Sequence, residues 1–317
     1  MDAVHVVGAG GIGLAVGYAL RAAGVRVAFV EADAGRRGAI RVDERPPIAA
    51  DFVPFDDWTP VPGSWVLLCT KCYDNAVVLD RLTVPVKLLP IQNGFDPRLA
   101  AHGHDFEGIA SFVSEADRTS PTTRITRPGE LHLGGRTASP SADLQELAVA
   151  LQLAGLFKVT VVERIEPIKY AKLMYNSAIS PLAAAAGIDN GMLLSVPAAR
   201  KLFFALLQEN YAILKASNVE LGKVGPFHPR TVAWILRRRW LASLMAKGFE
   251  PSLRGTYCSM AGEIQKGRTE LDNYNGHLLR LADQTGTPCP LNRRVYELVS
   301  KMTADRATPS LDVLNQL

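Results

Sequence analysis

The sequence predicts an α/β domain followed by an all-helical domain, and three observations support this fold class. Short apolar runs alternate with helical stretches in the first half, as in a parallel sheet with helices on both faces. A glycine-rich turn directly follows the first of these runs. Beyond residue 166, apolar residues recur at helical spacing and strand-like alternation is almost absent. We therefore expect a first domain over residues 1–164 and a second over residues 165–317.

The elements expected in each domain follow from these periodicities. In the first domain the strands are residues 4–7, 25–30, 64–70, 86–92, 108–113 and 157–162. Pro128 and Gly129 suit the turn of a hairpin over residues 125–134. In the second domain the helices are residues 167–186, 198–217, 229–245, 252–266, 270–285 and 291–303.

The glycine-rich turn has the spacing G-x-G-x-x-G between a predicted strand and a predicted helix. Its residues are Gly8, Ala9, Gly10, Gly11, Ile12 and Gly13. The next predicted strand is followed by Glu31, which completes the dinucleotide-binding fingerprint of a Rossmann domain. Gly8 permits the tight turn, Gly10 lets the backbone approach a pyrophosphate, and Gly13 lets the helix pack on the strand. We expect the helix N-terminus to bind the phosphates; the alternative is a glycine-rich turn without a ligand.

Bulk composition excludes several classes of partner. The chain has 317 residues, with 35 Lys and Arg against 31 Asp and Glu, a net charge of +4. This balance does not favour nucleic acid as a partner. No apolar segment is long enough to span a membrane, and the apolar N-terminus lacks the basic region of a signal peptide. We therefore expect no membrane partner and a cytoplasmic location.

Cys69 and Cys72 form a C-x-x-C pair, which raises the question of zinc or redox chemistry. No second C-x-x-C and no nearby histidine pair completes a tetrahedral site. Two thiols beside a strand end are the better interpretation, and we predict no metal site.

A polar stripe interrupts the apolar helix predicted over residues 167–186. Lys172, Asn176 and Ser180 lie four residues apart, so they share one helical face. A solvated face usually carries several charges, and this one carries a single lysine, so we favour a site-lining stripe. Glu270 follows Gly267 and Thr269 at a predicted helix start. Its alternative interpretation is a carboxylate that complements the helix dipole.

These residues belong to an ordered set of motifs that resembles the ketopantoate reductases, or 2-dehydropantoate 2-reductases. The motifs are G-A-G-G-I-G at 8–13, T-K-C-Y-D at 70–74, Q-N-G at 92–94, K-x-x-x-N-x-x-x-S-P-L at 172–182, N-G at 190–191, S-M-x-x-E at 259–263 and T-E-L-D-x-x-N-G at 269–276. The resemblance covers nearly the whole chain and is more specific for the superfamily than for the substrate. It implies an N-terminal Rossmann dinucleotide-binding domain, a helical domain for substrate binding and dimerisation, and hydride transfer from NAD(P)H to a small 2-keto acid.

The resemblance also implies roles for individual residues. Lys172 matches the catalytic lysine, whose ammonium would stabilise negative charge on the former carbonyl oxygen and donate a proton. Glu270 matches the glutamate that holds the reacting oxygen or a substrate hydroxyl. Ser259 matches the serine that binds the substrate carboxylate, and Asn176 an asparagine that orients the substrate.

Further positions are implied by the same motifs as binding residues. For the substrate they are Asn93, Ser180 and Asn190. For the cofactor they are the glycine turn, Glu31, Lys71 and again Asn93.

Three departures from the family pattern bear on substrate and cofactor. Ser180 stands where the family usually has Asn, and it lacks the amide donors. The family pattern continues with P-L-T, and Ala183 stands where that pattern has Thr. The loop before Glu270 is one residue shorter than the usual G-R-P-T-E. Glu31 lies where NADPH-using members typically have Arg, and a carboxylate there accepts bonds from ribose hydroxyls and repels a 2′-phosphate. Arg36 and Arg37 follow and could offset this repulsion. We therefore favour NAD as the cofactor and keep NADP as the alternative.

We therefore expect a cytoplasmic homodimeric NAD(P)-dependent reductase that converts ketopantoate to pantoate, a step of pantothenate biosynthesis. One alternative is a dehydrogenase of the same fold with another substrate in specialised metabolism, which Ser180 and Ala183 motivate. The other is a non-catalytic nucleotide-sensing protein, against which the presence of Lys172 and Glu270 argues.

Overall fold

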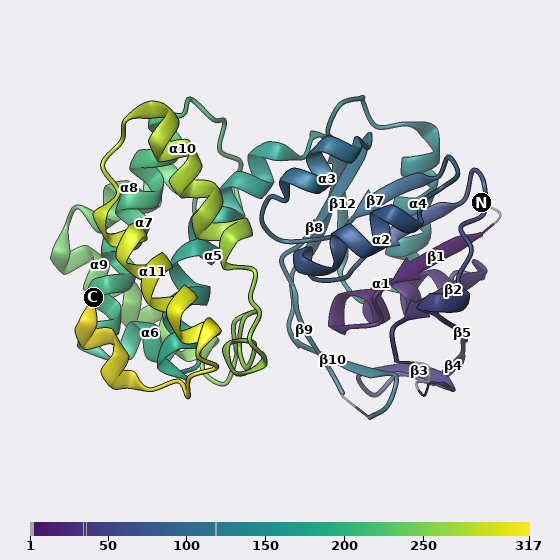
Figure 1. Ribbon diagram of the computed structural model, residues 1–317, viewed down its shortest axis with the longest axis horizontal. Coiled ribbons are helices and arrows are strands. Elements are labelled where there is room, and N and C mark those ends of the chain that lie inside the picture. The colour runs from purple at the N-terminus through teal and green to yellow at the C-terminus, as the bar shows by residue number, and fades with distance from the viewer. Residues whose placement is uncertain (1–2, 34, 36, 118) are drawn as a thin grey trace. The chain divides into compact units, whose positions relative to one another are not determined.

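The computed structural model describes residues 3–33, 35, 37–117 and 119–317 (Figure 1). Arg36, one of the two arginines expected near the cofactor, lies outside the described residues. The chain divides into two compact units. The first is Met1–Gln92 with Asp96–Ile165, and the second is Asn93–Phe95 with Glu166–Leu317. The first unit is α/β and the second is helical, so the predicted fold class is confirmed.

The centre of the first unit is a five-stranded sheet in which every neighbouring pair is parallel. In sheet order its strands are β5 (Asp51–Pro54), β2 (Val27–Glu31), β1 (Val4–Val7), β6 (Trp65–Leu68) and β7 (Lys87–Pro90). The chain order reverses between β1 and β6. In open α/β sheets a ligand binds at the carboxyl ends of the strands at such a switch point. The sequence analysis missed β5, whose four residues begin with an aspartate and end with a proline.

Both faces of this sheet are buried, because successive strand residues enter different cores. Val6 packs in the core that includes Leu14 of α1 (Gly11–Ala22) and Leu144 of α4 (Ala142–Leu153). Val7 packs in the core that includes Val78 of α2 (Asn75–Arg81) and Leu99 of α3 (Pro97–His102). This arrangement explains why the strands are continuous apolar runs rather than alternating ones.

Two smaller sheets complete the first unit. One has the order β4 (Ile48–Ala49), β3 (Ala39–Val42), β10 (Thr122–Arg127) and β9 (Val113–Ala116). The other has the order β12 (Lys158–Arg164), β11 (Glu130–Gly135) and β8 (Phe106–Ala110).

The hairpin predicted over residues 125–134 is wrong. β10 pairs with β9 and β3, whereas β11 pairs with β8 and β12, so the Pro128–Gly129 turn joins two different sheets. The predicted strand over residues 108–113 is likewise divided, because β8 ends at Ala110 and β9 begins at Val113. A turn motif predicts the reversal of the chain but not the partner of each strand.

The second unit is built around the long helix α5 (Glu166–Ala186), which packs against α7 (Pro197–Ala216) and α11 (Pro290–Ala304). Its remaining α-helices are α6 (Met192–Ser195), α8 (Pro229–Leu236), α9 (Arg239–Phe249) and α10 (His277–Thr285). Short 3₁₀ helices are η3 (Glu250–Leu253), η4 (Ile264–Lys266) and η6 (Leu311–Gln316), and in the first unit η1 (Phe55–Asp57) and η2 (Cys72–Asp74). A π-helical turn, η5 (Asp272–Gly276), precedes α10. In the described part of the chain, no helix combines the length and apolarity needed to cross a membrane.

Two predicted helices of this unit are corrected by the structure. Residues 229–245 form parts of two helices, because Arg238 is extended (φ −115°, ψ 92°) between α8 and α9. Residues 252–266 are turns and 3₁₀ helix rather than an α-helix. Gly255 (φ 67°) and Gly262 (φ 72°) adopt left-handed conformations there, which an α-helix does not accommodate.

Candidate active site

The glycine turn of the first unit has three crowded positions, Gly8, Gly11 and Gly13, and one open position, Gly10. Gly8 has φ 93°, and a Cβ there would lie 2.8 Å from the Thr70 nitrogen. A Cβ on Gly13 would lie 2.0 Å from the Gly8 carbonyl oxygen, so this glycine permits the helix to contact the strand. A Cβ on Gly10 would meet none of the described atoms within 4 Å. The fold itself requires Gly8 and Gly13, whereas the space beside Gly10 is open to a ligand.

The N-terminus of α1 suits an anion. Gly10 is its N-cap, and among the described residues no side chain caps the helix and no acidic residue lies in its first turn. The Ser114 hydroxyl donates to the Gly11 carbonyl at 2.9 Å, which ties β9 to the start of the helix. Backbone N–H groups and the helix dipole favour a phosphate at such an end. The residues present therefore fit the pyrophosphate of a dinucleotide.

Glu31 lies beside this turn at the end of β2. One carboxylate oxygen accepts from the Ala9 N–H at 3.1 Å, and the other accepts from the Ala32 N–H at 3.0 Å. The structure therefore brings together the glycine turn and the acid that the sequence analysis assigned to the cofactor. Arg37 is described and exposed.

A buried amide network, which the sequence analysis missed, lies at the ends of β6 and β7. The Gln92 amide nitrogen donates to the Thr70 carbonyl at 2.8 Å and to Asn75 Oδ1 at 2.7 Å. Asn75 in turn donates to Gln92 Oε1 at 3.1 Å and to Asp96 Oδ2 at 2.7 Å. This network holds the turn that carries the half-buried Lys71. Asn75 directly follows the T-K-C-Y-D motif, which was the available signal.

The C-x-x-C pair lies at the same strand end. Burial raises the pKa of the Cys69 thiol to about 12, so it stays protonated at neutral pH. The Cys72 thiol donates to Gln92 Oε1 at 3.9 Å. Within the described residues, no group of three or more His, Cys, Asp or Glu side chains is arranged to bind a metal ion.

The polar stripe of the second unit lies on one face of α5. Lys172 and Asn176 are half-buried, and Ser180 is buried. The Ser180 carbonyl accepts from the Cys258 thiol at 3.5 Å, which joins α5 to the segment that carries Ser259. The stripe therefore runs from half-buried positions at Lys172 and Asn176 to a buried position at Ser180.

Glu270 and Ser259 are linked through Tyr274. The Tyr274 hydroxyl donates to Glu270 Oε2 at 3.3 Å and lies 3.1 Å from the Ser259 hydroxyl. Glu270 is 2% exposed and Tyr274 is completely buried. A carboxylate that only complements a helix dipole would be solvated, so this arrangement favours a more specific role for Glu270. The sequence analysis missed Tyr274, which lies at an unspecified position of the T-E-L-D-x-x-N-G motif.

Asn93 belongs to the second unit although it follows a strand of the first. The Phe95 N–H donates to the Asn273 carbonyl at 3.0 Å, and the Asn273 amide donates to the Phe95 carbonyl at 3.2 Å. Gly94 has φ 75°, and a Cβ there would lie 2.6 Å from the Tyr274 ring. The Q-N-G motif is thus attached to the turn that follows Glu270, which groups Asn93 with the predicted substrate residues.

Asn190 supports the segment that leads to Ser259. Its amide donates to the Thr256 hydroxyl at 3.1 Å, and its N–H donates to the Thr256 carbonyl at 2.9 Å. Asn190 Oδ1 is buried and has no partner among the described residues.

His277 follows η5 and stacks on Phe95, with 4.4 Å between the ring centroids. Burial and, to a smaller extent, the positive charges of Arg280 and Lys169 together lower the pKa of His277 to about 4. This imidazole is therefore neutral in the folded protein at neutral pH.

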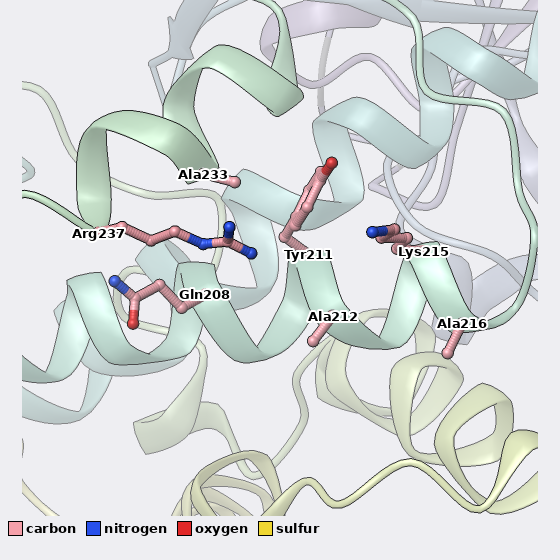
Figure 2. Close-up of a pocket in the computed structure, with 7 residues that line it drawn as sticks. All are labelled: Gln208, Tyr211, Ala212, Lys215, Ala216, Ala233 and Arg237. Carbon is pink, nitrogen blue, oxygen red and sulfur yellow. The ribbon is translucent and has the colours of Figure 1, made fainter.

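A cavity of about 600 Å³ lies between α7 and α8 (Figure 2). It is lined by Gln208, Tyr211, Ala212, Lys215, Ala216, Ala233 and Arg237. None of the predicted site residues is among them.

The fold and the glycine turn define a dinucleotide-binding protein with a helical second unit, and comparisons with known proteins give its family. Residues 4–104 match the family model of ketopantoate reductase PanE/ApbA, and residues 164–303 match the model of its C-terminal domain. The chain belongs to the ketopantoate reductase PanE/ApbA family, whose members are NAD(P)H-binding oxidoreductases. The family resemblance predicted from the motifs is confirmed.

Individual relatives are distant. A 2-dehydropantoate 2-reductase of Pyrobaculum aerophilum is 26% identical over 236 residues, covering 74% of this chain and 75% of the relative. A PanE/ApbA family ketopantoate reductase from Ralstonia eutropha JMP134 has a TM-score of 0.76 at 22% identity, covering 96% of this chain and 99% of that one. D-mandelate dehydrogenase, solved with NADH and anilino(oxo)acetate, has a TM-score of 0.78 at 18% identity with the same coverage. The solved structures establish the fold.

An added methyl group should lower stability at the crowded Gly13, whereas at the open Gly10 it should mainly weaken cofactor binding. Gly13→Ala should destabilise the protein by roughly 2 kcal/mol or more, because its Cβ would overlap a backbone oxygen. Gly10→Ala should change the free energy of unfolding by about 0.5 kcal/mol or less and weaken NADH binding, because its Cβ would enter the ligand space. Urea unfolding and NADH fluorescence titration measure the two effects. Equal loss of stability in both variants would contradict this assignment.

The lowered pKa of His277 predicts that the folded protein loses stability in acid. Its pKa is about 4 in the folded protein against 6.5 ordinarily, so the unfolded chain binds the proton more tightly. The free energy of unfolding should therefore fall as pH drops from 6.5 through 4, by up to about 3 kcal/mol from this residue. In His277→Gln the fall should be smaller, as measured by urea unfolding at several pH values. The same pH dependence in both proteins would show that His277 does not contribute.

Proposed function

We propose that this protein reduces a small 2-keto acid with a nicotinamide cofactor, and that ketopantoate is its substrate, with pantoate as product. The observation that carries the proposal is the hydrogen-bonded chain from the buried Glu270 through the buried Tyr274 to the exposed Ser259, in the same unit as the lysine-bearing face of α5. A carboxylate, a hydroxyl and an ammonium are the groups needed to bind and protonate a keto acid. The family match supports the reductase class.

Lys172 is the proposed proton donor. A nicotinamide cofactor, when bound, would supply a hydride for the carbonyl carbon of the substrate. The Lys172 ammonium stabilises the negative charge that develops on the carbonyl oxygen and transfers a proton to it. Its half-buried position strengthens this electrostatic interaction relative to water.

The remaining polar residues of the second unit bind the substrate in this proposal. Glu270 accepts a hydrogen bond from a substrate hydroxyl, or from the hydroxyl that the reacting oxygen becomes in the product, and Tyr274 holds the Glu270 carboxylate in place. Ser259 binds the substrate carboxylate. The others assigned to the substrate are Asn93, Asn176, Ser180 and Asn190.

NAD is the proposed preferred cofactor. The Glu31 carboxylate lies beside the glycine turn, where it can accept hydrogen bonds from ribose hydroxyls. The same charge would repel the 2′-phosphate of NADP. Lys71, in the turn that follows β6, is proposed to place a positive charge beside the cofactor.

A different 2-keto acid is the main alternative to ketopantoate as the substrate. Ser180 and Ala183 replace larger polar groups of the family pattern, and a shorter side chain leaves room for a different keto acid. D-mandelate dehydrogenase, which shares the fold, was solved with anilino(oxo)acetate. A panel of aliphatic and aryl 2-keto acids separates the two, because turnover of aryl acids without turnover of ketopantoate would favour the alternative. Cofactor binding without turnover of any acid would favour a nucleotide sensor.

We also propose that the protein acts in the cytoplasm as a homodimer. Trp234, Trp240 and Leu244 on α8 and α9 are 50%, 71% and 59% exposed, which makes this surface a candidate for contact with a second copy. Light scattering would then give about twice the monomer mass of 34.3 kDa.

Lys172→Ala tests the proton donor. Turnover of ketopantoate with reduced cofactor should fall by roughly 10²–10⁴-fold, because the oxyanion loses its cation and its acid. NADH binding should be retained. The matched control is Lys215→Ala, an exposed lysine of the same unit. Undiminished turnover in the Lys172 variant, measured by cofactor absorbance, would refute the assignment.

Glu31→Gln tests cofactor choice while keeping an acceptor for the Ala9 N–H. The wild-type kcat/KM should be higher with NADH than with NADPH. In the variant this ratio should drop by about tenfold, since removing the charge removes the repulsion of the 2′-phosphate. Steady-state kinetics with each cofactor provide the measurement. A wild-type preference for NADPH would overturn the proposal.

A further inference from the structure

A proline interrupts the helix that carries the polar stripe. Pro181 lies inside α5, and its ring nitrogen cannot donate the helical bond to the carbonyl four residues earlier. That carbonyl belongs to Ser177, which is completely buried. A buried carbonyl without a donor costs about 1–3 kcal/mol, so this position requires another donor.

Asn275 supplies that donor from the π-helical turn η5. Its amide nitrogen donates to the Ser177 carbonyl at 2.9 Å and to Asn292 Oδ1 at 3.0 Å. Asn275 is completely buried, and both hydrogens of its amide are used. The carbonyl that the proline leaves without a helical donor is therefore bonded by a side chain from another element.

The orientation of this amide is set by a distant carboxylate. Glu209 on α7 can only accept, and it accepts from the Asn292 amide at 2.8 Å and from the Asn292 N–H at 2.7 Å. The Asn292 amide also donates to Asn210 Oδ1 at 2.9 Å, so Asn292 Oδ1 faces Asn275. The whole network is directional, and the Asn275 nitrogen must point toward Ser177.

We propose that Asn275 is a positioning residue, which holds the interrupted turn of α5 against the turn that follows Glu270. The Ser177 carbonyl lies in the chain between Asn176 and Ser180, and η5 begins two residues after Glu270. The bond from Asn275 therefore joins the two segments that carry the proposed substrate contacts. This inference rests on the proposed function, because those contacts are assigned there.

Asn210, on α7, provides a matched control because its amide also bonds a backbone carbonyl of α5. Its amide donates to the Met174 carbonyl at 2.9 Å, and it is also completely buried. Residue 178 is an alanine, so the Met174 carbonyl keeps its ordinary helical donor. Asn210 also accepts from the Asn292 amide, but Glu209 still orients Asn292 when Asn210 is removed. The two asparagines thus differ in whether the carbonyl that each one bonds depends on it.

The experiment is a double-mutant cycle with Pro181→Ala, which restores the helical N–H to the Ser177 carbonyl. Asn275→Ala alone should lower kcat for the keto acid by about tenfold or more and raise its KM, because substrate groups are misplaced. The Kd for NADH should stay within about twofold. In the Pro181→Ala background, Asn275→Ala should cost only about threefold in kcat. Asn210→Ala should cost the same in both backgrounds.

Each outcome decides the inference. Rescue of Asn275→Ala, but not of Asn210→Ala, by Pro181→Ala supports it, and equal losses of kcat in both backgrounds overturn it. If Asn275→Ala folds only together with Pro181→Ala, the coupling is supported, and failure to fold in both backgrounds overturns it. Should the wild type reduce no keto acid, the proposed function fails, and the same cycle on unfolding midpoints still tests the Pro181–Asn275 coupling.

Discussion

A buried carbonyl without a helical donor constrains much of the second unit. Pro181 removes the helical bond to the carbonyl of Ser177, which is completely buried. The Asn275 amide donates a hydrogen bond to that carbonyl, and the Glu209 carboxylate orients this amide through Asn292. Glu209 also accepts from the first backbone N–H groups of α11. One buried hydrogen-bond network therefore links α5, η5, α7 and α11.

The nucleotide-binding unit is organised by backbone contact rather than by side-chain amides. Gly13 brings α1 against the Gly8 carbonyl, and this close approach leaves the start of the helix exposed to an anion. The two units thus offer different chemistry. Backbone N–H groups suit phosphates, which every dinucleotide carries, whereas the second unit carries the side chains that are proposed to bind the keto acid.

Local patterns predicted the elements whose causes are local. β1, β2, β6 and β7 are apolar runs buried on both faces, and α5, α7 and α11 follow helical periodicity. The errors concern choices that depend on distant residues. The turn at Pro128 and Gly129 could not reveal that β10 and β11 join different sheets. The apolar spacing over residues 252–266 concealed the left-handed conformations of Gly255 and Gly262.

The sequence by itself determined the glycine turn with Glu31, and the stripe of α5, because the spacing of residues sets which of them share a turn or a helical face. It determined the family through the order of its motifs. Only the tertiary structure decided that Asn93 belongs with the helical unit, and that Tyr274 joins Glu270 to Ser259. These relations depend on hydrogen bonds between residues far apart in the chain, and no local periodicity encodes the partner of a buried polar group.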